Sequence, residues 1–154
     1  EAVNLELAQR ARANGSEVWL NAAPARDIGP ALIGQLDVVI MNRVEAQFYQ
    51  DFFSKPAHQR LSKIITKGAD GLDLILPDGA CQSFPAFEVP SLSSHGAGDV
   101  FVGALAAQRL AQIPWETALR YAQAAAALHV ATPWRQRAAI TPGDIKALMQ
   151  KGAR

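Results

Sequence analysis

The sequence predicts an α/β protein with a mostly parallel sheet, flanked by helices and carrying a hairpin at one edge. Three observations lead to this prediction. Short apolar runs typical of strands recur along the first half of the chain, stretches with helical periodicity separate them, and a Pro-Asp-Gly turn at residues 77–79 joins two strand-like runs. With 154 residues and 49% apolar side chains, one domain with a sizeable core is expected.

The first half begins with an amphipathic helical pattern that runs from Glu1 to the stop signal at Gly15. Residues 16–23 form a short apolar run that ends in a loop, as a strand does. Residues 36–42 form a near-continuous apolar run, which is expected of a strand buried on both faces. Residues 43–53 then have helical periodicity.

The second half begins with a strand and turn at residues 62–71, followed by a hairpin over residues 71–87. Helical segments follow at residues 99–112, 114–131 and 141–151. Thr141 is a suitable cap for the last of these, and proline stands near the start of the second and third.

Composition narrows the classes of function. Lysine and arginine total 15 against 14 acidic residues, a net charge of +1 without basic runs, which argues against nucleic acid or a membrane as a partner. Cys81 is the only cysteine, so an intramolecular disulfide is impossible, and we expect a small core residue there. The sequence has neither a membrane-length apolar run nor a leader, and a cytoplasmic protein is expected. Without an initiator methionine, it is interpreted as a fragment.

The segment from Gly96 to Asp99, Gly-Ala-Gly-Asp, stands where a helix is predicted to begin, and two interpretations compete for it. It could be a tight turn followed by an acid that suits the positive end of the helix dipole. It could equally be an anion-binding loop, with free backbone amides and a carboxylate that accepts a proton. Asn21, Asn42 and Lys67 stand at the carboxyl ends of predicted strands, where ligands collect in open parallel sheets.

Several motifs together resemble the ribokinase-like (PfkB) carbohydrate kinase family. In chain order they are VWLNAAPAR at 18–26, NRVE at 42–45, ITKGADG at 65–71, GAGDVFVGAL at 96–105 and YAQAAAAL at 121–128. The resemblance covers nearly the whole chain, whereas members of the family have longer chains. Residues 1–154 are therefore expected to be the C-terminal, nucleotide-binding part of a ribokinase-like domain, without its N-terminal half and lid.

The resemblance implies that Asp99 is the general base, while the amides of Gly96, Ala97 and Gly98 hold the charge that develops on the phosphate. It also implies that Asn42 and Glu45 order Mg²⁺ and its waters. A helix cap with an acid three residues later would give the same spacing.

The resemblance further assigns Asn21 to the nucleotide phosphates, Thr66 and Gly68 to nucleotide contacts, and Gln123 to the helix beside adenine. Each position has a plainer explanation: a turn at a strand end, an ordinary loop, or a close helix contact made by small residues. Gln123 replaces the asparagine of many relatives, which weakens its assignment.

Two further expectations concern the segment before Gly96. Relatives often carry an acidic residue there that helps to hold a monovalent cation, and Ser93 stands in its place, which argues against potassium activation. His95 lies beside the loop and is expected to contact phosphate or solvent, because the family uses its aspartate as the base.

The predicted function is phosphoryl transfer from ATP to a hydroxyl of a small sugar, by an enzyme that is inactive in this fragment alone because the acceptor site is absent. The alternative is a nucleotide- or phosphate-binding module without catalysis. A dinucleotide-binding dehydrogenase domain is less favoured, because the glycine fingerprint is missing from the first strand-to-helix turn. The sugar is undetermined, with a tilt toward a pentose, and a homodimer would form through the absent lid.

Overall fold

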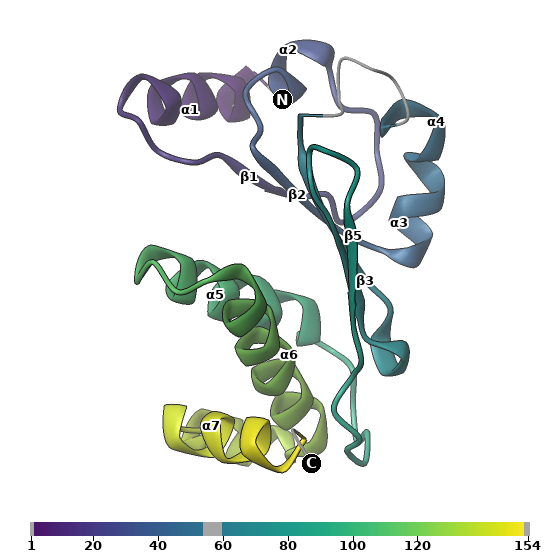
Figure 1. Cartoon of the computed structure of the whole chain (residues 1–154), viewed down its shortest axis with the longest axis vertical. Coiled ribbons are helices and arrows are strands. Elements are labelled where there is room, and N and C mark those ends of the chain that lie inside the picture. Colours follow the sequence, from purple (N-terminus) through teal and green to yellow (C-terminus); the bar gives the residue numbers. More distant parts are fainter. Residues whose placement is uncertain (1, 54–59, 153–154) are drawn as a thin grey trace. The chain divides into compact units, whose positions relative to one another are not determined.

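The fold was analysed in a computed structural model, which describes residues 2–53 and 60–152. Contacts divide the chain into two compact units, which are described separately. Unit 1 comprises Glu1–Gly68 and Leu72–Ser83, and unit 2 comprises Ala69–Gly71 and Phe84–Arg154. Figure 1 follows the elements along the chain. None of the helices in the described part has the length and apolarity needed to cross a membrane.

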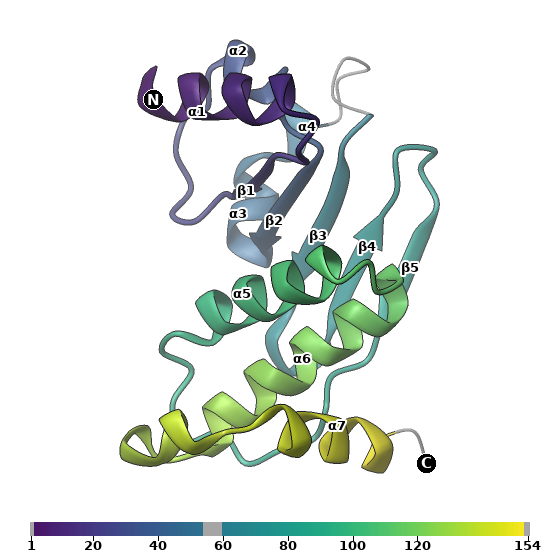
Figure 2. The same cartoon turned by 90° about the vertical axis from the view of Figure 1, so that its left-hand side faces the viewer.

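The strands of the described residues form one sheet in the order β1-β2-β3-β4-β5, which Figure 2 displays. Their bounds are β1 Trp19–Asn21, β2 Val38–Asn42, β3 Ser62–Thr66, β4 Leu72–Ile75 and β5 Cys81–Phe84. β1, β2 and β3 are parallel, whereas β4 runs antiparallel to β3. The mostly parallel sheet with an edge hairpin is therefore confirmed.

The helices of unit 1 pack on the strands through one shared core. They are α1 Ala2–Ala13, α2 Pro30–Ile33, α3 Arg43–Phe48 and α4 Gln50–Phe53. Alternate residues Val39 and Met41 of β2 point to the same face and meet Ile33, Tyr49 and Phe53 there. Leu61 and Leu36 lie in the same core and are at most 2% exposed.

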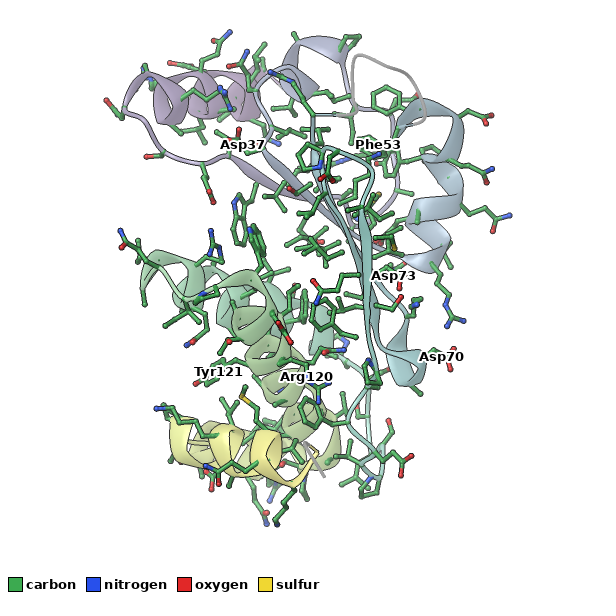
Figure 3. The ribbon with its side chains drawn as sticks, viewed as in Figure 1. Asp37, Phe53, Asp70, Asp73, Arg120 and Tyr121 are labelled. Carbon is green, nitrogen blue, oxygen red and sulfur yellow. The ribbon has the colours of Figure 1, made fainter. Side chains whose placement is uncertain are left out.

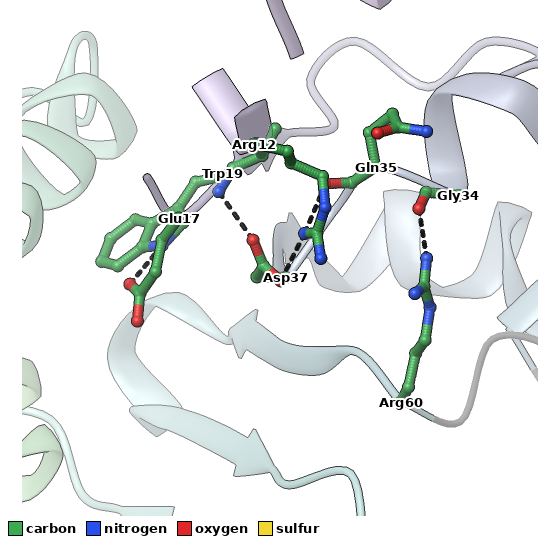
Figure 4. Close-up of polar contacts among 8 residues, drawn as sticks. Arg12, Glu17, Trp19, Gly34, Gln35, Asp37 and Arg60 are labelled. Atoms are coloured by element: carbon green, nitrogen blue, oxygen red, sulfur yellow. Dashed lines mark hydrogen bonds and ion pairs between the residues drawn. The ribbon is translucent and has the colours of Figure 1, made fainter. Parts of the chain in front are cut away.

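Asp37, the residue before β2, joins three segments of unit 1 (Figure 4). Its Oδ1 accepts a hydrogen bond from Arg12 of α1 at 2.7 Å, and its Oδ2 accepts one from the amide of Val18 at 2.8 Å. Arg12 also donates to the carbonyl of Gln35 at 3.1 Å. The end of α1 is thus fastened to the strands that follow it.

Unit 2 is built on three helices and a 3₁₀ segment: α5 Ala97–Leu110, α6 Trp115–Ala131, η3 Trp134–Ala139 and α7 Pro142–Lys151. Its core gathers Phe87, Ala124, Ala125 and Ile145. Because alanine has a short side chain, the alanine-rich face of α6 allows close helix packing. Arg120 stacks over the Phe87 ring with 4.0 Å between its guanidinium carbon and the ring centroid, and it is labelled in Figure 3.

The predicted helices and strands are all present, but the first two strands are shorter than predicted and the helix predicted over residues 43–53 is divided into α3 and α4. The structure adds α2, η3 and the 3₁₀ segment η2 Gly68–Asp70. All three are short elements, for which periodicity gives little signal. The expectation for Cys81 is wrong, because its side chain is exposed. The reason is its place on β5, the edge strand, whose first three residues are exposed.

Candidate active site

Three candidate residues of unit 1 lie at the carboxyl ends of neighbouring parallel strands. Asn42, the last residue of β2, is paired in register with Thr66, the last residue of β3. Asn21, the last residue of β1, is paired with Ile40, two residues before Asn42. Since adjacent strands lie about 4.8 Å apart, these side chains share one edge of the sheet. This edge is where ligands bind in open α/β sheets.

Asn42 and Glu45 form a reciprocal cap at the start of α3. The Glu45 amide donates to Asn42 Oδ1 at 3.0 Å, and the Asn42 amide donates to Glu45 Oε2 at 2.7 Å. Glu45 is only 7% exposed, so the cap holds a carboxylate that is largely removed from water. The plainer explanation of this motif, a helix cap, is therefore present in the molecule.

The same pair provides a limited set of oxygen ligands for Mg²⁺. The second carboxylate oxygen of Glu45 lies outside the cap, and Mg²⁺ needs few protein ligands because it keeps several waters. Within the described residues, no group of three or more His, Cys, Asp or Glu side chains could hold a metal ion. The residues therefore fit a magnesium ion that is held mainly by water and phosphate oxygens.

The loop after β3 is fastened to the hairpin through Asp73, which accepts hydrogen bonds from two side chains. Lys67 donates to Asp73 Oδ1 at 2.7 Å, and Ser83 donates to the same oxygen at 2.7 Å. The hydrogen bond from Lys67 lowers the pKa of Asp73 below its usual value, and the bond from Ser83 acts in the same direction. Asp73 is labelled in Figure 3.

Gly68 follows Lys67 with a φ of +60°, a conformation that favours glycine. An added Cβ would meet nothing within 4 Å among the described residues. The left-handed backbone conformation therefore explains why position 68 carries glycine. Thr66 donates its hydroxyl to the carbonyl of Met41 at 3.3 Å, which links β3 to β2.

Asn21 opens onto a pocket of about 150 Å³ in unit 1. The pocket is lined by residues 20–24 and 26–28, together with Asn4 of α1, Leu32 of α2 and Tyr49. The Tyr49 hydroxyl accepts a hydrogen bond from the Arg26 amide at 3.0 Å and donates to the Arg26 carbonyl at 2.7 Å. Tyr49 thus fixes the wall of this pocket, although the sequence patterns gave no sign of that role.

In unit 2, Gly96 caps α5 with a φ of +78°, and Ala97, Gly98 and Asp99 form the first turn. The Ala97 amide donates to the Ser94 carbonyl at 3.1 Å. Gly98 and Asp99 are exposed, and their amides lie in the first turn, where the helix offers them no earlier carbonyl. Among the first-turn amides of α5, those of Gly98 and Asp99 are therefore open, whereas that of Ala97 is bonded.

The left-handed position at this helix start is Gly96 and not Gly98. Gly98 lies within α5, and an added Cβ there would meet nothing within 4 Å among the described residues. At Gly96, an added Cβ would come within 3.2 Å of His129 Nε2. Glycine is therefore explained differently at the two positions. Backbone conformation and packing account for Gly96, whereas at Gly98 the missing side chain leaves the start of the helix open to approach.

Asp99 differs from the two other acids that occupy the third position of a helix. Glu45 in α3 and Asp144 in α7 each accept a hydrogen bond from the amide of their cap residue, at 2.7 and 2.8 Å. Within residues 2–53 and 60–152, the carboxylate of Asp99 makes no such bond, and the side chain is exposed. Its carboxylate is free to accept a proton from a bound molecule.

Gln123 has its side-chain amide occupied by its own unit. Its Nε2 lies within hydrogen-bonding distance of the carbonyls of Phe84 and Pro85, at 3.3 and 3.4 Å. Arg120 donates to its Oε1 at 3.4 Å, and the residue is 9% exposed. These bonds favour the plainer explanation, a buried helix contact, for this position.

Comparison with known proteins identifies the family. Residues 1–139 match the pfkB family of carbohydrate kinases. The chain is 36% identical over 146 residues to the 2-dehydro-3-deoxygalactonokinase of Haloferax volcanii, covering 89% of this chain and 45% of that protein. It is 30% identical over 135 residues to the ribokinase of Haemophilus influenzae, covering 80% of this chain and 44% of that protein.

Solved structures give the same fold. The ribokinase of Thermotoga maritima superimposes with a TM-score of 0.80 at 26% identity, covering 95% of this chain and 52% of that one. The Arabidopsis thaliana ribokinase complexed with ribose and ATP gives a TM-score of 0.83 at 20% identity, covering 96% and 52%. The chain spans about half the length of these relatives. It has the ribokinase-like α/β fold and belongs to the pfkB family of carbohydrate kinases.

Proposed function

We propose that the complete protein transfers the γ-phosphate of ATP to a hydroxyl group of a small sugar or sugar acid. Family membership supports the reaction class. The proposal also takes residues 1–154 as the nucleotide-binding part of the enzyme. The substrates named for its relatives, ribose and 2-dehydro-3-deoxygalactonate, are the first acceptors to test.

In this proposal, Asp99 takes the proton of the acceptor hydroxyl. The hydroxyl oxygen forms a bond to the γ-phosphorus as the bond to the bridging oxygen of ADP breaks, and ADP leaves with that electron pair. The first-turn amides of Gly98 and Asp99 stabilise the charge on the transferring phosphate, and the positive end of the α5 dipole adds to this effect. The amide of Ala97 would join them only by giving up its bond to Ser94.

The unit 1 residues are proposed to serve the nucleotide. Asn42 and Glu45 would hold Mg²⁺, which neutralises phosphate charge when bound. Asn21 would contact the phosphates, while Thr66 and Gly68 would contact the nucleotide through a loop that presents open backbone at Gly68. In unit 2, Gln123 would help to form the part of the site beside adenine by holding α6 in place, since its side-chain amide is already bonded.

The observation that carries the proposal is the unpaired, exposed carboxylate of Asp99 beside open amides. If Asp99 only complemented the helix dipole, replacing it with asparagine would cost about 0.3–1 kcal/mol of stability and leave turnover intact. If it is the base, Asp99→Asn keeps the shape and removes the proton acceptor. Turnover should then fall about 10²- to 10⁴-fold while ATP still binds.

The test compares Asp99→Asn with Asp144→Asn in the complete protein, by sugar-dependent ADP release, ATP affinity and urea unfolding. Asp144→Asn is the matched control, because it changes an acid at the same helical position that serves as a cap. We expect the control to lose stability, because its hydrogen bonds to Thr141 are weakened, and to keep its turnover. Near-normal turnover of Asp99→Asn would refute the base assignment. Nucleotide binding without ADP release for any acceptor would favour the binding module.

A further inference from the structure

Arg137, in η3, donates to three backbone carbonyls from two separate segments of unit 2. Its Nε donates to Thr132 at 3.1 Å, just after α6. Its two terminal nitrogens donate to His95 and Ser93, both at 3.2 Å, in the segment that leads into α5. All three guanidinium nitrogens thus donate hydrogen bonds to main-chain oxygens, and the side chain is half-buried.

His129 completes this cluster from α6. Its Nε2 lies 2.9 Å from the Arg137 Nη1 and 2.9 Å from the carbonyl oxygen of His95. The ring also lies under the helix cap, since a Cβ added to Gly96 would come within 3.2 Å of the same nitrogen. His129 therefore packs against Gly96, the residue before α5, and makes its polar contact with the carbonyl of the preceding residue, His95.

Backbone hydrogen bonds also join the same two segments. The amides of Leu92 and Ser93 both approach the carbonyl of Val130, at 2.9 and 3.3 Å. These bonds fix the beginning of the segment, whereas Arg137 acts nearer to the helix. Residues 93 and 95 are exposed, so few apolar contacts hold them. The conformation of residues 93–96 therefore depends strongly on the guanidinium.

We propose that Arg137 is a positioning residue that sets residues 93–96 so that the first-turn amides of α5 and the Asp99 carboxylate face the transferring phosphate. This rests on the function proposed above. Arginine suits the task because its guanidinium is planar, permanently charged and able only to donate. It also supplies a fixed positive charge to carbonyl oxygens that a small cation could otherwise bind. Its own charge makes an added cation unnecessary at these oxygens.

The test replaces Arg137 with alanine in the complete protein, with Arg135→Ala as the matched control. Arg135 lies in the same 3₁₀ segment and stacks over Trp134, at 5.9 Å from its ring. Both variants lose one positive charge, but only Arg137→Ala removes the bonds to Ser93, His95 and Thr132. The first measurement is amide hydrogen exchange, which needs no sugar substrate.

We expect Arg137→Ala to speed exchange at the hydrogen-bonded amides of Ser93, His95 and Ala97 at least ten-fold, while α7 exchanges as in the parent. The kcat should fall at least ten-fold with little change in the sugar KM, and millimolar guanidinium should restore part of it. Parent turnover should be equal in potassium and in a bulky organic cation, whereas Arg137→Ala should gain turnover from potassium. Arg135→Ala should match the parent in every measurement.

Unchanged exchange at the amides of Ser93, His95 and Ala97 in Arg137→Ala would overturn the proposal, as would an equal response of Arg135→Ala. If exchange rises but kcat holds, the link to catalysis is refuted. If the parent protein phosphorylates no acceptor, the proposed function fails, while the exchange measurement still tests the positioning role. Should Arg137→Ala not fold, Arg137→Lys serves instead. Its single ammonium cannot replace the three-sided donor, so parent-like exchange in that variant would also overturn the proposal.

Discussion

Gly71, which precedes β4, gives the sharpest prediction of stability. Its φ is +89°, and a Cβ added there would lie 2.0 Å from the Phe84 carbonyl oxygen and 3.0 Å from the Ala86 amide nitrogen. Gly79, in the hairpin turn, has nearly the same φ of +85°, but an added Cβ meets nothing within 4 Å among the described residues. Comparing alanine at the two positions separates backbone strain from steric overlap.

Gly79→Ala should cost about 1–2 kcal/mol, the usual penalty of a left-handed conformation for a residue with a Cβ. Gly71→Ala has the same penalty and must also displace the backbone at Phe84, a core residue that is only 4% exposed. Overpacking of this kind typically adds about 1–3 kcal/mol. The total for Gly71→Ala is therefore about 2–5 kcal/mol.

The measurement is urea unfolding of both variants and the parent protein, followed by the intrinsic fluorescence of tryptophan. Since both substitutions remove a glycine and add one methyl group, their effects on the unfolded chain are matched. A free energy of unfolding for Gly71→Ala within about 0.5 kcal/mol of that for Gly79→Ala would refute the reasoning. It would mean that the segment around Phe84 relaxes without cost.

Two further predictions concern unit 1. Tyr49→Phe removes both hydrogen bonds to the Arg26 backbone. We therefore expect the free energy of unfolding to fall by about 1–2 kcal/mol and amide exchange at residues 22–28 to become faster. Parent-like exchange at these residues would contradict the role assigned to Tyr49. The pKa of Asp73 is lowered in the folded protein, and Asp73 forms an ion pair with Lys67. This ion pair therefore stabilises the folded protein at pH values above the unfolded pKa of about 3.9. The stabilisation is lost as the pH falls through the folded pKa. The stability gap between the parent and Asp73→Asn, about 1 kcal/mol or less at pH 6, should therefore shrink toward pH 3 in urea titrations, and a constant gap would exclude this linkage.

Much of the fold could be predicted because its signals are local. The apolar run before Asn42 and the turn at residues 77–79 determine strands by periodicity and turn chemistry, and both are present. The helix predicted from residue 99 is also present, although α5 begins two residues earlier, at Ala97. By contrast, the exposure of Cys81 was not predicted, because turn chemistry indicates a hairpin but does not say which side chains of its outer strand face solvent.

The candidate site was predictable in its residue types but not in its contacts. The spacing of Asn42 and Glu45 indicated either a cap or a metal site, and only the structure establishes that the cap is formed. Gln123 bonds to carbonyls 38 and 39 residues earlier in the chain, which no local pattern indicates. Arg137 was missed for the same reason, since its partners at Ser93 and His95 are more than 40 residues away.

The cap formed by Asn42 and Glu45 has a consequence for how such chains change over evolutionary time. Because the pair is needed to begin α3, selection for folding alone would preserve it in a descendant that had lost the ability to phosphorylate anything. Asp99 has no comparable duty, so drift should erase it first. A relative that has lost activity would then keep the asparagine and glutamate but lose the aspartate. Asp99 is therefore the more informative position for distinguishing active enzymes from their inactive descendants.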